Sequence, residues 1–195
     1  PIANVRLEYD ESGNQTGQFV SCLEDKLFQP AGFNWRAKYD KGNLVEKVYL
    51  NNVKEPYLNP NEGYAKYIAK YNERGRLIEL SFFDTEEKPC LNNKGYAKVS
   101  YGYDEWGNVT EILFLGVDGK PCTDSSGVAR CVMRYDERGN KIEEATSDTE
   151  GNPCLNAQGA AKMTAVCDSW GNVTEMTYWG TDGRLGLNKE GFAKL

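Results

Sequence analysis

Short segments that alternate apolar and polar residues recur along this chain. Residues 97–104, "AKVSYGYD", alternate without a break, and so do residues 129–136, "ARCVMRYD". In the first segment one side carries Ala97, Val99, Tyr101 and Tyr103. A helix would repeat every 3.6 residues, whereas a two-residue period is typical of a half-buried strand. We therefore predict a strand at this place in each recurrence.

Each alternating segment continues into a turn and a second apolar segment. The turn has the form Asp-Glu-x-Gly, in which Asp can accept hydrogen bonds from the backbone ahead and Gly can adopt a positive φ. The following segment, such as residues 108–115, "NVTEILFL", completes a predicted β-hairpin. A four-residue loop at 104–107 places Ile112 and Phe114 on the face of Val99. Pairing Asp104 with Asn108 would instead bury a carboxylate, so we predict the first register.

This register turns one glutamate of each hairpin outward, beside a basic residue of the neighbouring strand. The glutamates are Glu46, Glu79, Glu111, Glu143 and Glu175, and the basic residues are Lys66, Lys98, Arg130 and Lys162. A row of carboxylates could bind cations or act as acids and bases. We interpret the row as cross-strand charge pairs, each contributing about 0.2–1 kcal/mol.

The tyrosine that ends the alternating segment returns at a fixed interval. Tyr39, Tyr71, Tyr103, Tyr135 and Cys167 are each 32 residues apart, and Tyr9 precedes the first of them by 30. This period predicts a single tandem-repeat array over 1–195. Its copies are residues 3–32, 33–64, 65–96, 97–128, 129–160 and 161–192. We predict an all-β fold of tandem antiparallel hairpins stacked into an elongated or rolled sheet or solenoid. The final "GFAKL" starts another copy, so we expect a fragment of a longer protein.

The fourth letter of the turn phrase alternates between arginine and tryptophan. The residues are Arg74, Trp106, Arg138 and Trp170, which gives a 64-residue super-repeat over 65–192. If each copy contributed three strands, the Trp turns would line one edge and the Arg turns the opposite edge. We predict these four residues as binding residues, with the tryptophans facing a carbohydrate or protein ligand. The alternative is that each Trp folds back as a cap on the adjacent hairpin.

Composition excludes several classes of function. The 195 residues are 39% hydrophobic and 12% aromatic, enough to form a core. With 29 acidic and 23 basic residues the net charge is −6, which speaks against a nucleic-acid partner. No apolar run is long enough to predict membrane insertion. We expect no cofactor and no metal: histidine is absent, the six cysteines form no CxxC pair, and the Asp-Gly pairs at Asp118 and Asp182 fit turns better than calcium loops.

Three of the cysteines share one phrase, Pro-Cys, at Cys90, Cys122 and Cys154. A repeated structural position favours buried free thiols, with disulfides as the alternative.

The phrases "YNERGRL" at 71–77 and "YDERGN" at 135–140 carry a resemblance to a known family. They resemble the tyrosine-aspartate repeats of the Rhs family, whose core phrase is Tyr-Asp-x-x-Gly-Arg-Leu. Here Asn usually stands in place of the Arg, and the period is longer. The resemblance implies an all-β, hairpin-stacked scaffold in large bacterial surface or secreted proteins. It implies binding or encapsulating roles, including a shell around a toxin, and it does not imply catalysis.

Together these features predict a non-catalytic repeat scaffold or binding module that takes a carbohydrate or protein ligand at exposed aromatic hairpin tips. A structural spacer or shell segment of a larger protein is the alternative. A carboxylate-pair glycosidase, which needs no histidine, is less favoured, and its residues would lie where the repeat breaks, at 17–33 or 49–64. The resemblance favours a secreted or surface location, and free thiols leave the cytoplasm open.

Overall fold

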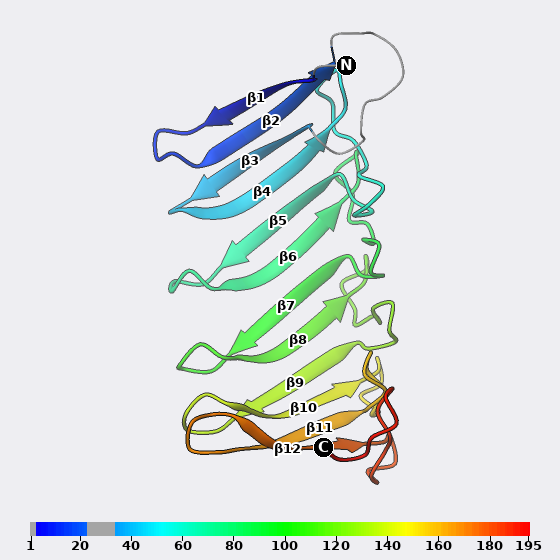
Figure 1. Ribbon diagram of the computed structural model, residues 1–195. Helices are drawn as coiled ribbons and strands as arrows, with labels where there is room; N and C mark the ends of the chain where they lie inside the picture. The colour runs from blue at the N-terminus through cyan, green and yellow to red at the C-terminus, as the bar shows by residue number, and fades with distance from the viewer. Residues whose placement is uncertain (1–2, 23–33) are drawn as a thin grey trace. The chain divides into compact units, whose positions relative to one another are not determined.

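The protein is built from antiparallel β-hairpins in two compact units, Pro1–Asn93 and Lys94–Leu195 (Figure 1). The computed structural model describes residues 3–22 and 34–195. The first unit contains β1 (Ala3–Tyr9), β2 (Gln15–Cys22), β3 (Asn34–Asp40), β4 (Asn43–Leu50), β5 (Lys66–Tyr71) and β6 (Leu77–Phe83). The second contains β7 (Lys98–Tyr103), β8 (Val109–Leu115), β9 (Arg130–Tyr135), β10 (Lys141–Ser147), β11 (Lys162–Cys167) and β12 (Val173–Trp179).

Within each unit the strands lie side by side in chain order, and every pair is antiparallel. The all-β hairpin-repeat prediction is therefore confirmed. Each copy contributes two strands, and the short third segment forms only isolated bridges such as Leu115 with Pro121. The described residues contain no helix of the length and apolarity that crossing a membrane requires.

The apolar face of β7 and β8 is the predicted one, but the predicted register is wrong, because a four-residue loop would place Val99 opposite Ile112. Val99 pairs with Phe114 and Tyr101 with Ile112, so these apolar side chains share a face. Asp104 nevertheless also donates its backbone N–H to the Asn108 carbonyl, at 3.1 Å. Both pairings hold because the register shifts between Gly102 and Tyr103, where one extra residue of β8 is accommodated. Near the turn the hairpin therefore has the alternative register, and the bulge returns the apolar side chains of the two strands to one face.

Neighbouring hairpins are paired over a shorter length than the strands within a hairpin. In the second unit β8 and β9 pair through three residues, as do β10 and β11. Connector loops extend this junction at one end of the sheet. The backbone N–H groups of Phe114 and Thr146 donate to the carbonyls of Ala129 and Ala161 of the next hairpin, each at 2.9 Å. The hairpins are therefore joined most closely at their connector ends.

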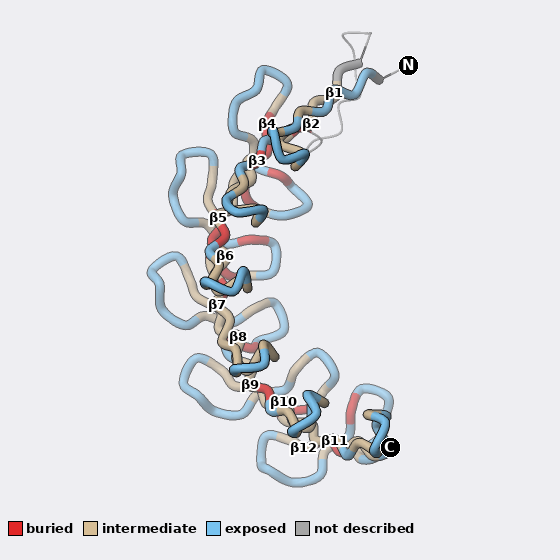
Figure 2. The backbone as a smooth tube through the Cα atoms, turned by 90° about the vertical axis from the view of Figure 1, so that its left-hand side faces the viewer, coloured by how far each residue is buried: buried red, intermediate tan, exposed pale blue. Residues whose placement is uncertain are grey.

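The core lies at the same connector end. Figure 2 shows the exposed residues in the loops and the buried ones in short stretches beside the sheet. In the second unit Tyr96 of a connector stacks on Phe114 of β8, with ring centroids 4.5 Å apart, and Val99 is 1% exposed. In the first unit Tyr64 contacts Phe82 of β6, at 4.6 Å. Because the sheet is one layer thick, the connector aromatics supply the second surface that a strand face needs for burial.

Candidate functional site

A single five-residue loop is used throughout the chain, including at the hairpin tips. In the tip at 136–140 the Asp136 carboxylate accepts hydrogen bonds from the N–H groups of Arg138, at 3.0 Å, and Asn140, at 2.8 Å. The Asn140 amide also donates to the second Asp136 oxygen, at 2.9 Å. The Asn that departs from the family phrase therefore closes the loop on its own Asp. The same bonding to residues two and four ahead recurs at Asp10, Asn51, Asn72, Asp84, Asp124, Asp148, Asn156, Asp168 and Asn188.

The loop carboxylates bind protons more weakly than ordinary aspartates. The Asn140 and Asn172 side-chain amides, followed by their backbone N–H groups, hold the pKa of Asp136 and Asp168 below the usual 3.8. Asp118 accepts the N–H of Lys120 and Asp182 accepts the N–H of Arg184, each at 3.0 Å, and each carboxylate also lies near the basic side chain of the same partner, at 4.0 and 3.8 Å. These Asp-Gly pairs lie in turns, as expected. In the described part of the chain no group of three or more His, Cys, Asp or Glu residues could hold a metal ion.

The tyrosine of the turn phrase joins each hairpin to the preceding one. The Tyr135 hydroxyl donates to the Val109 carbonyl at 2.9 Å, and the Tyr71 hydroxyl donates to the Leu44 carbonyl at 3.0 Å. Tyr39 makes the equivalent bond to Gln15, at 3.2 Å. Since the strand pairing between hairpins is short, this bond fixes the two hairpins where their strands diverge. Sequence reasoning assigned Tyr to the apolar face and missed this role of its hydroxyl.

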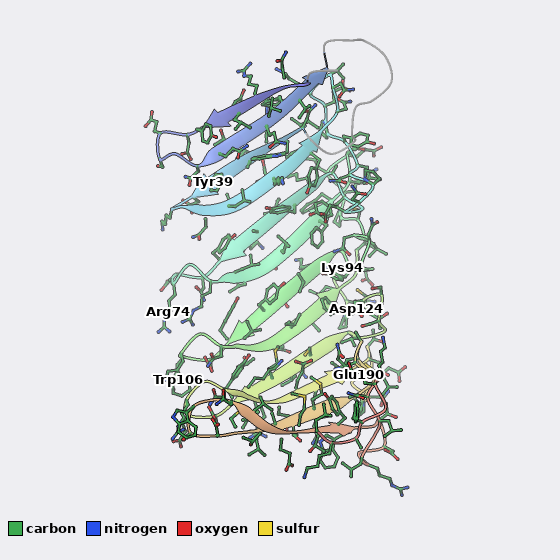
Figure 3. All side chains as sticks on the ribbon, in the orientation of Figure 1. Tyr39, Arg74, Lys94, Trp106, Asp124 and Glu190 are labelled. Atoms are coloured by element: carbon green, nitrogen blue, oxygen red, sulfur yellow. The ribbon has the colours of Figure 1, made fainter. Side chains whose placement is uncertain are left out.

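The connector turns provide a second link between copies. In the second unit the Ser125 N–H donates to the Lys94 carbonyl at 2.7 Å, and the Lys189 N–H donates to the Gln158 carbonyl at 2.8 Å. In the first unit Asn93 donates to Glu62, at 2.9 Å. Figure 3 places Asp124 and Glu190 at this end of the second unit, opposite Trp106. Backbone bonds of this kind depend on turn geometry, so a sequence pattern does not reveal them.

The predicted charge pairs form at several copies. Glu46 lies between Lys38, at 2.7 Å, and Lys66, at 3.5 Å. Glu111 pairs with Arg130, and Glu175 pairs with Lys194 at 2.8 Å. The outward orientation is confirmed, because Glu111 lies opposite Gly102 on the face away from Ile112. These acids therefore serve as partners of the basic residues across the strands.

The predicted placement of the tips on two edges is wrong. Each copy contributes two strands instead of three, so Trp106, Arg138 and Trp170 all lie at the same edge of the second unit. The alternation has another physical reason there: the Arg138 guanidinium donates to the Ser169 carbonyl of the next tip, at 2.8 Å. The arginine side chain of this turn is therefore hydrogen-bonded to the backbone of the Trp-containing turn that follows it.

The predicted binding residues remain on the surface. The side chains of Trp106 and Trp170 are 73% and 85% exposed, whereas a ring capping a neighbouring hairpin would be largely covered. Arg138 is exposed and uses its guanidinium for the contact with Ser169, and Arg74 occupies the matching exposed position in the first unit. The structure thus brings Arg138 to the residue before Trp170, while the binding role of these residues stays a prediction.

The described cysteines are free thiols, and they are half-buried rather than buried. Burial raises the pKa of Cys90, Cys122 and Cys154, and it raises that of Cys131 to about 11. Such thiols are protonated at neutral pH and are poor nucleophiles. The side chain of Cys22 lies outside the described residues, as does 23–33, most of one stretch where the repeat breaks. The other stretch, 49–64, consists of turns capped by Asn51 and Asn59.

Comparison with known proteins reveals a likeness of fold. No family model matches the chain, and no curated protein matches it. Among solved structures it is similar to the Tc holotoxin pore of Photorhabdus luminescens, with 15% identity and a TM-score of 0.57 over 93% of this chain. Two crystal structures of TcdB2-TccC3 proteins match with the same values. In each case the chain spans 8% of the length of the matched protein.

Proposed function

We propose that this chain is a non-catalytic scaffold segment of a larger protein built from tyrosine-aspartate repeats. One observation carries the proposal: residues that recur in most copies connect a copy to its neighbour. Tyr135 bonds to the preceding hairpin, the connector turns bond to each other, and Glu111 pairs with Arg130 of the next hairpin. Repeat arrays gain stability from such nearest-neighbour contacts. A chain whose recurrent side chains make such contacts is suited to form an extended structural scaffold.

The shell or spacer reading is favoured over a dedicated binding module. The fold likeness to toxin structures supports it, as does the resemblance of residues 71–77 to the Rhs phrase. We also propose that the chain belongs to the tyrosine-aspartate repeat family and that the protein is secreted or lies at the cell surface. The protonated thiols and the pairing of Glu46 and Glu111 with basic residues support a non-catalytic role.

The test is an exchange of whole copies in the full-length protein. Residues 129–160 are replaced by the sequence of 65–96, a copy of the same Arg-tipped class. A scaffold keeps its hydrodynamic radius and its resistance to limited proteolysis, because the new copy offers the same links. Loss of both properties in a protein that still shows native β circular dichroism would contradict the proposal. The proposal would also be contradicted if the parent chain hydrolysed a polysaccharide and Glu→Gln substitutions abolished that activity.

A second candidate function is ligand binding at the Trp turns, which the exposure of Trp106 and Trp170 favours. Exposed indoles can stack on sugar rings or anchor a protein partner. A glycan array probed with the parent chain and with a Trp106→Ala, Trp170→Ala double variant tests it. Binding that the double variant loses supports this function, and equal signals from the two proteins contradict it.

A further inference from the structure

The copy at 129–160 departs in the size of one side chain from the other copies that carry the outward glutamate. Four residues after that glutamate, these copies place Leu50, Phe83, Leu115, Ser147 and Trp179. Of these five residues, Ser147 is the only small one. A large-to-small change in a packed row leaves unfilled space unless neighbours move in.

A pocket of about 310 Å³ lies at this place, within the second unit. Ala145 and Ser147 of β10 belong to its lining, and so do Lys162 of β11 and Trp179 of β12. Strand register explains the arrangement, since Ala145 lies opposite Lys162 and Lys162 lies opposite Trp179. The turn residues Gly151 and Gly183 form the rim, where the lack of a side chain leaves the entrance open. This volume is at the small end of ligand pockets, which span about 300–1,000 Å³.

The charge pairing of the sheet is interrupted at the same pocket. The residues equivalent to Lys162 in other copies pair with the glutamate of the preceding hairpin: Lys66 with Glu46, Arg130 with Glu111 and Lys194 with Glu175. Within the described residues no ion pair joins Lys162 to its counterpart Glu143. The Lys162 ammonium instead lies 5.2 Å from the centroid of the Trp179 ring. A cation without a carboxylate partner therefore stands at the wall of the pocket.

Trp179 is held in a fixed orientation beside this cation. Its indole N–H donates to the Thr164 hydroxyl, at 3.1 Å. An indole whose polar atom is already bonded offers its ring as a rigid apolar surface. Ala145 and Ser147, which share the pocket with Trp179, belong to the preceding copy, so the repeat pattern alone does not reveal this arrangement.

We propose that this pocket binds a small ring-shaped carboxylate. Its carboxylate pairs with the Lys162 ammonium, while its ring packs over Ala145 against the indole of Trp179. The Ser147 hydroxyl provides a further hydrogen-bond donor, and Pro153 adds apolar surface. An acidic sugar and an aromatic acid share this chemistry. The site gives the scaffold a ligand-binding position at one copy, distinct from the Trp tips.

The test uses the intact chain and four probes: glucuronate and benzoate as carboxylates, and methyl glucoside and benzamide as neutral partners. Amide chemical-shift titration is followed by calorimetry. We expect at least one carboxylate to bind with a Kd below ~10 mM and its neutral partner to bind more weakly. Binding by glucuronate alone identifies an acidic sugar, and binding by benzoate alone identifies an aromatic acid. Failure of both carboxylates to bind overturns the proposal.

Two variants locate the site. Lys162→Met keeps the aliphatic stem and should weaken carboxylate binding roughly tenfold, whereas the exposed Lys189→Met control should leave it unchanged. Ser147→Leu restores the side chain found at Leu115 and should abolish binding by filling the pocket. If Ser147→Leu does not fold, Lys162→Met decides alone. Carboxylate binding that neither variant changes would place the ligand elsewhere and refute the assignment.

Discussion

At the residue scale, one hydroxyl group explains why tyrosine recurs at the end of the first strand. Phenylalanine would pack on the same face, but only tyrosine can donate to a backbone carbonyl of the preceding hairpin, as Tyr71 and Tyr135 do. The sixth copy has Cys167 in this position, and a thiol is too short to make the equivalent bond. The junction between β10 and β11 therefore lacks a link that its neighbours have.

Two substitutions test this role in opposite directions. Tyr135→Phe should lower the free energy of unfolding by about 0.5–1.5 kcal/mol, because it removes one intramolecular hydrogen bond. Cys167→Tyr should raise it by a similar amount by supplying the missing donor. Urea unfolding measures both. Tyr9→Phe is the matched control, since Tyr9 has no preceding hairpin in the described chain and should change little. Equal effects at Tyr9 and Tyr135 would show that the hydroxyl bond is not the cause.

Glycine at the fourth position of the five-residue loop adopts a positive φ, and the energetic cost of replacing it there can be measured separately from steric contacts. Gly151 has a φ of 85°, and a Cβ there would meet nothing within 4 Å. Gly151→Ala should therefore cost only the left-handed backbone strain, about 1–2 kcal/mol. Gly63 has a similar φ of 83°, but its Cβ would lie 2.7 Å from the Asn93 backbone nitrogen.

We expect Gly63→Ala to be clearly more destabilising than Gly151→Ala when both are measured by thermal unfolding. Gly151→Asn should recover part of the loss, since Asn tolerates the left-handed region. If Gly63→Ala and Gly151→Ala cost the same, the close approach of the two connector turns in the first unit is not tight enough to matter.

At the element scale, the strands and the face of each side chain follow from the sequence, while the exact register and the contacts between hairpins do not. The alternation at 97–104 and the cost of burying Glu111 were sufficient to predict that Val99 and Ile112 share a face, but a four-residue loop would place Tyr101 opposite Thr110 instead of Ile112. The bulge beside Tyr103 could not be predicted, because it depends on how the strand accommodates an extra residue near the turn. The tip contact from Arg138 to Ser169 ends on a backbone carbonyl, which every residue has, so no residue pattern marks it.

The candidate site shows the same division. The turn position of Trp106 and Trp170 left both an exposed and a capping ring open, and their exposure of 73% and 85% favours the exposed one. The edge they occupy did not follow, because the number of strands per copy could not be read from the repeat length. The pocket beside Trp179 was missed because it arises from the small side chain of Ser147. This difference in size is apparent only when Ser147 is compared with Leu115, the equivalent residue of another copy.

The five-residue loops predict how stability responds to acid. Folding lowers the pKa of Asp136 and Asp168 below 3.8, because the Asn140 and Asn172 amides bond to the charged carboxylates. A group whose pKa is lowered by folding contributes stability above its unfolded pKa and loses it as the pH falls through the folded value. The loops should therefore weaken as the pH drops below about 4.

Replacement of Asp136 and Asp168 by Asn should reduce the loss of stability at low pH. An Asn can still accept the two backbone bonds, as Asn72 does from Arg74 and Arg76, each at 3.0 Å, but it has no proton to gain. Urea midpoints of the Asp136→Asn, Asp168→Asn double variant between pH 5 and pH 2 should change less than those of the parent. Parallel profiles for the two proteins would contradict a role for these carboxylates.

At the scale of the whole molecule, the copies should be interchangeable parts with additive stability. In the described residues each copy has two strands joined by a tight turn, and its links reach the adjacent copies. In such arrays, stability is approximately a sum of copy and interface contributions. The fold is similar to that of much larger toxin proteins, and this chain spans 8% of their length.

The most direct test of this account is equilibrium unfolding of a chain from which residues 97–160 are removed, so that Tyr96 is joined to Ala161 in phase. We predict a folded protein with a cooperative transition, a lower free energy of unfolding and a smaller urea m-value, because less surface is exposed on unfolding. The control removes residues 97–152, which breaks the phase and should prevent folding of the second unit. An in-phase variant that unfolds like the control would contradict the claim that recurrent residues link interchangeable copies.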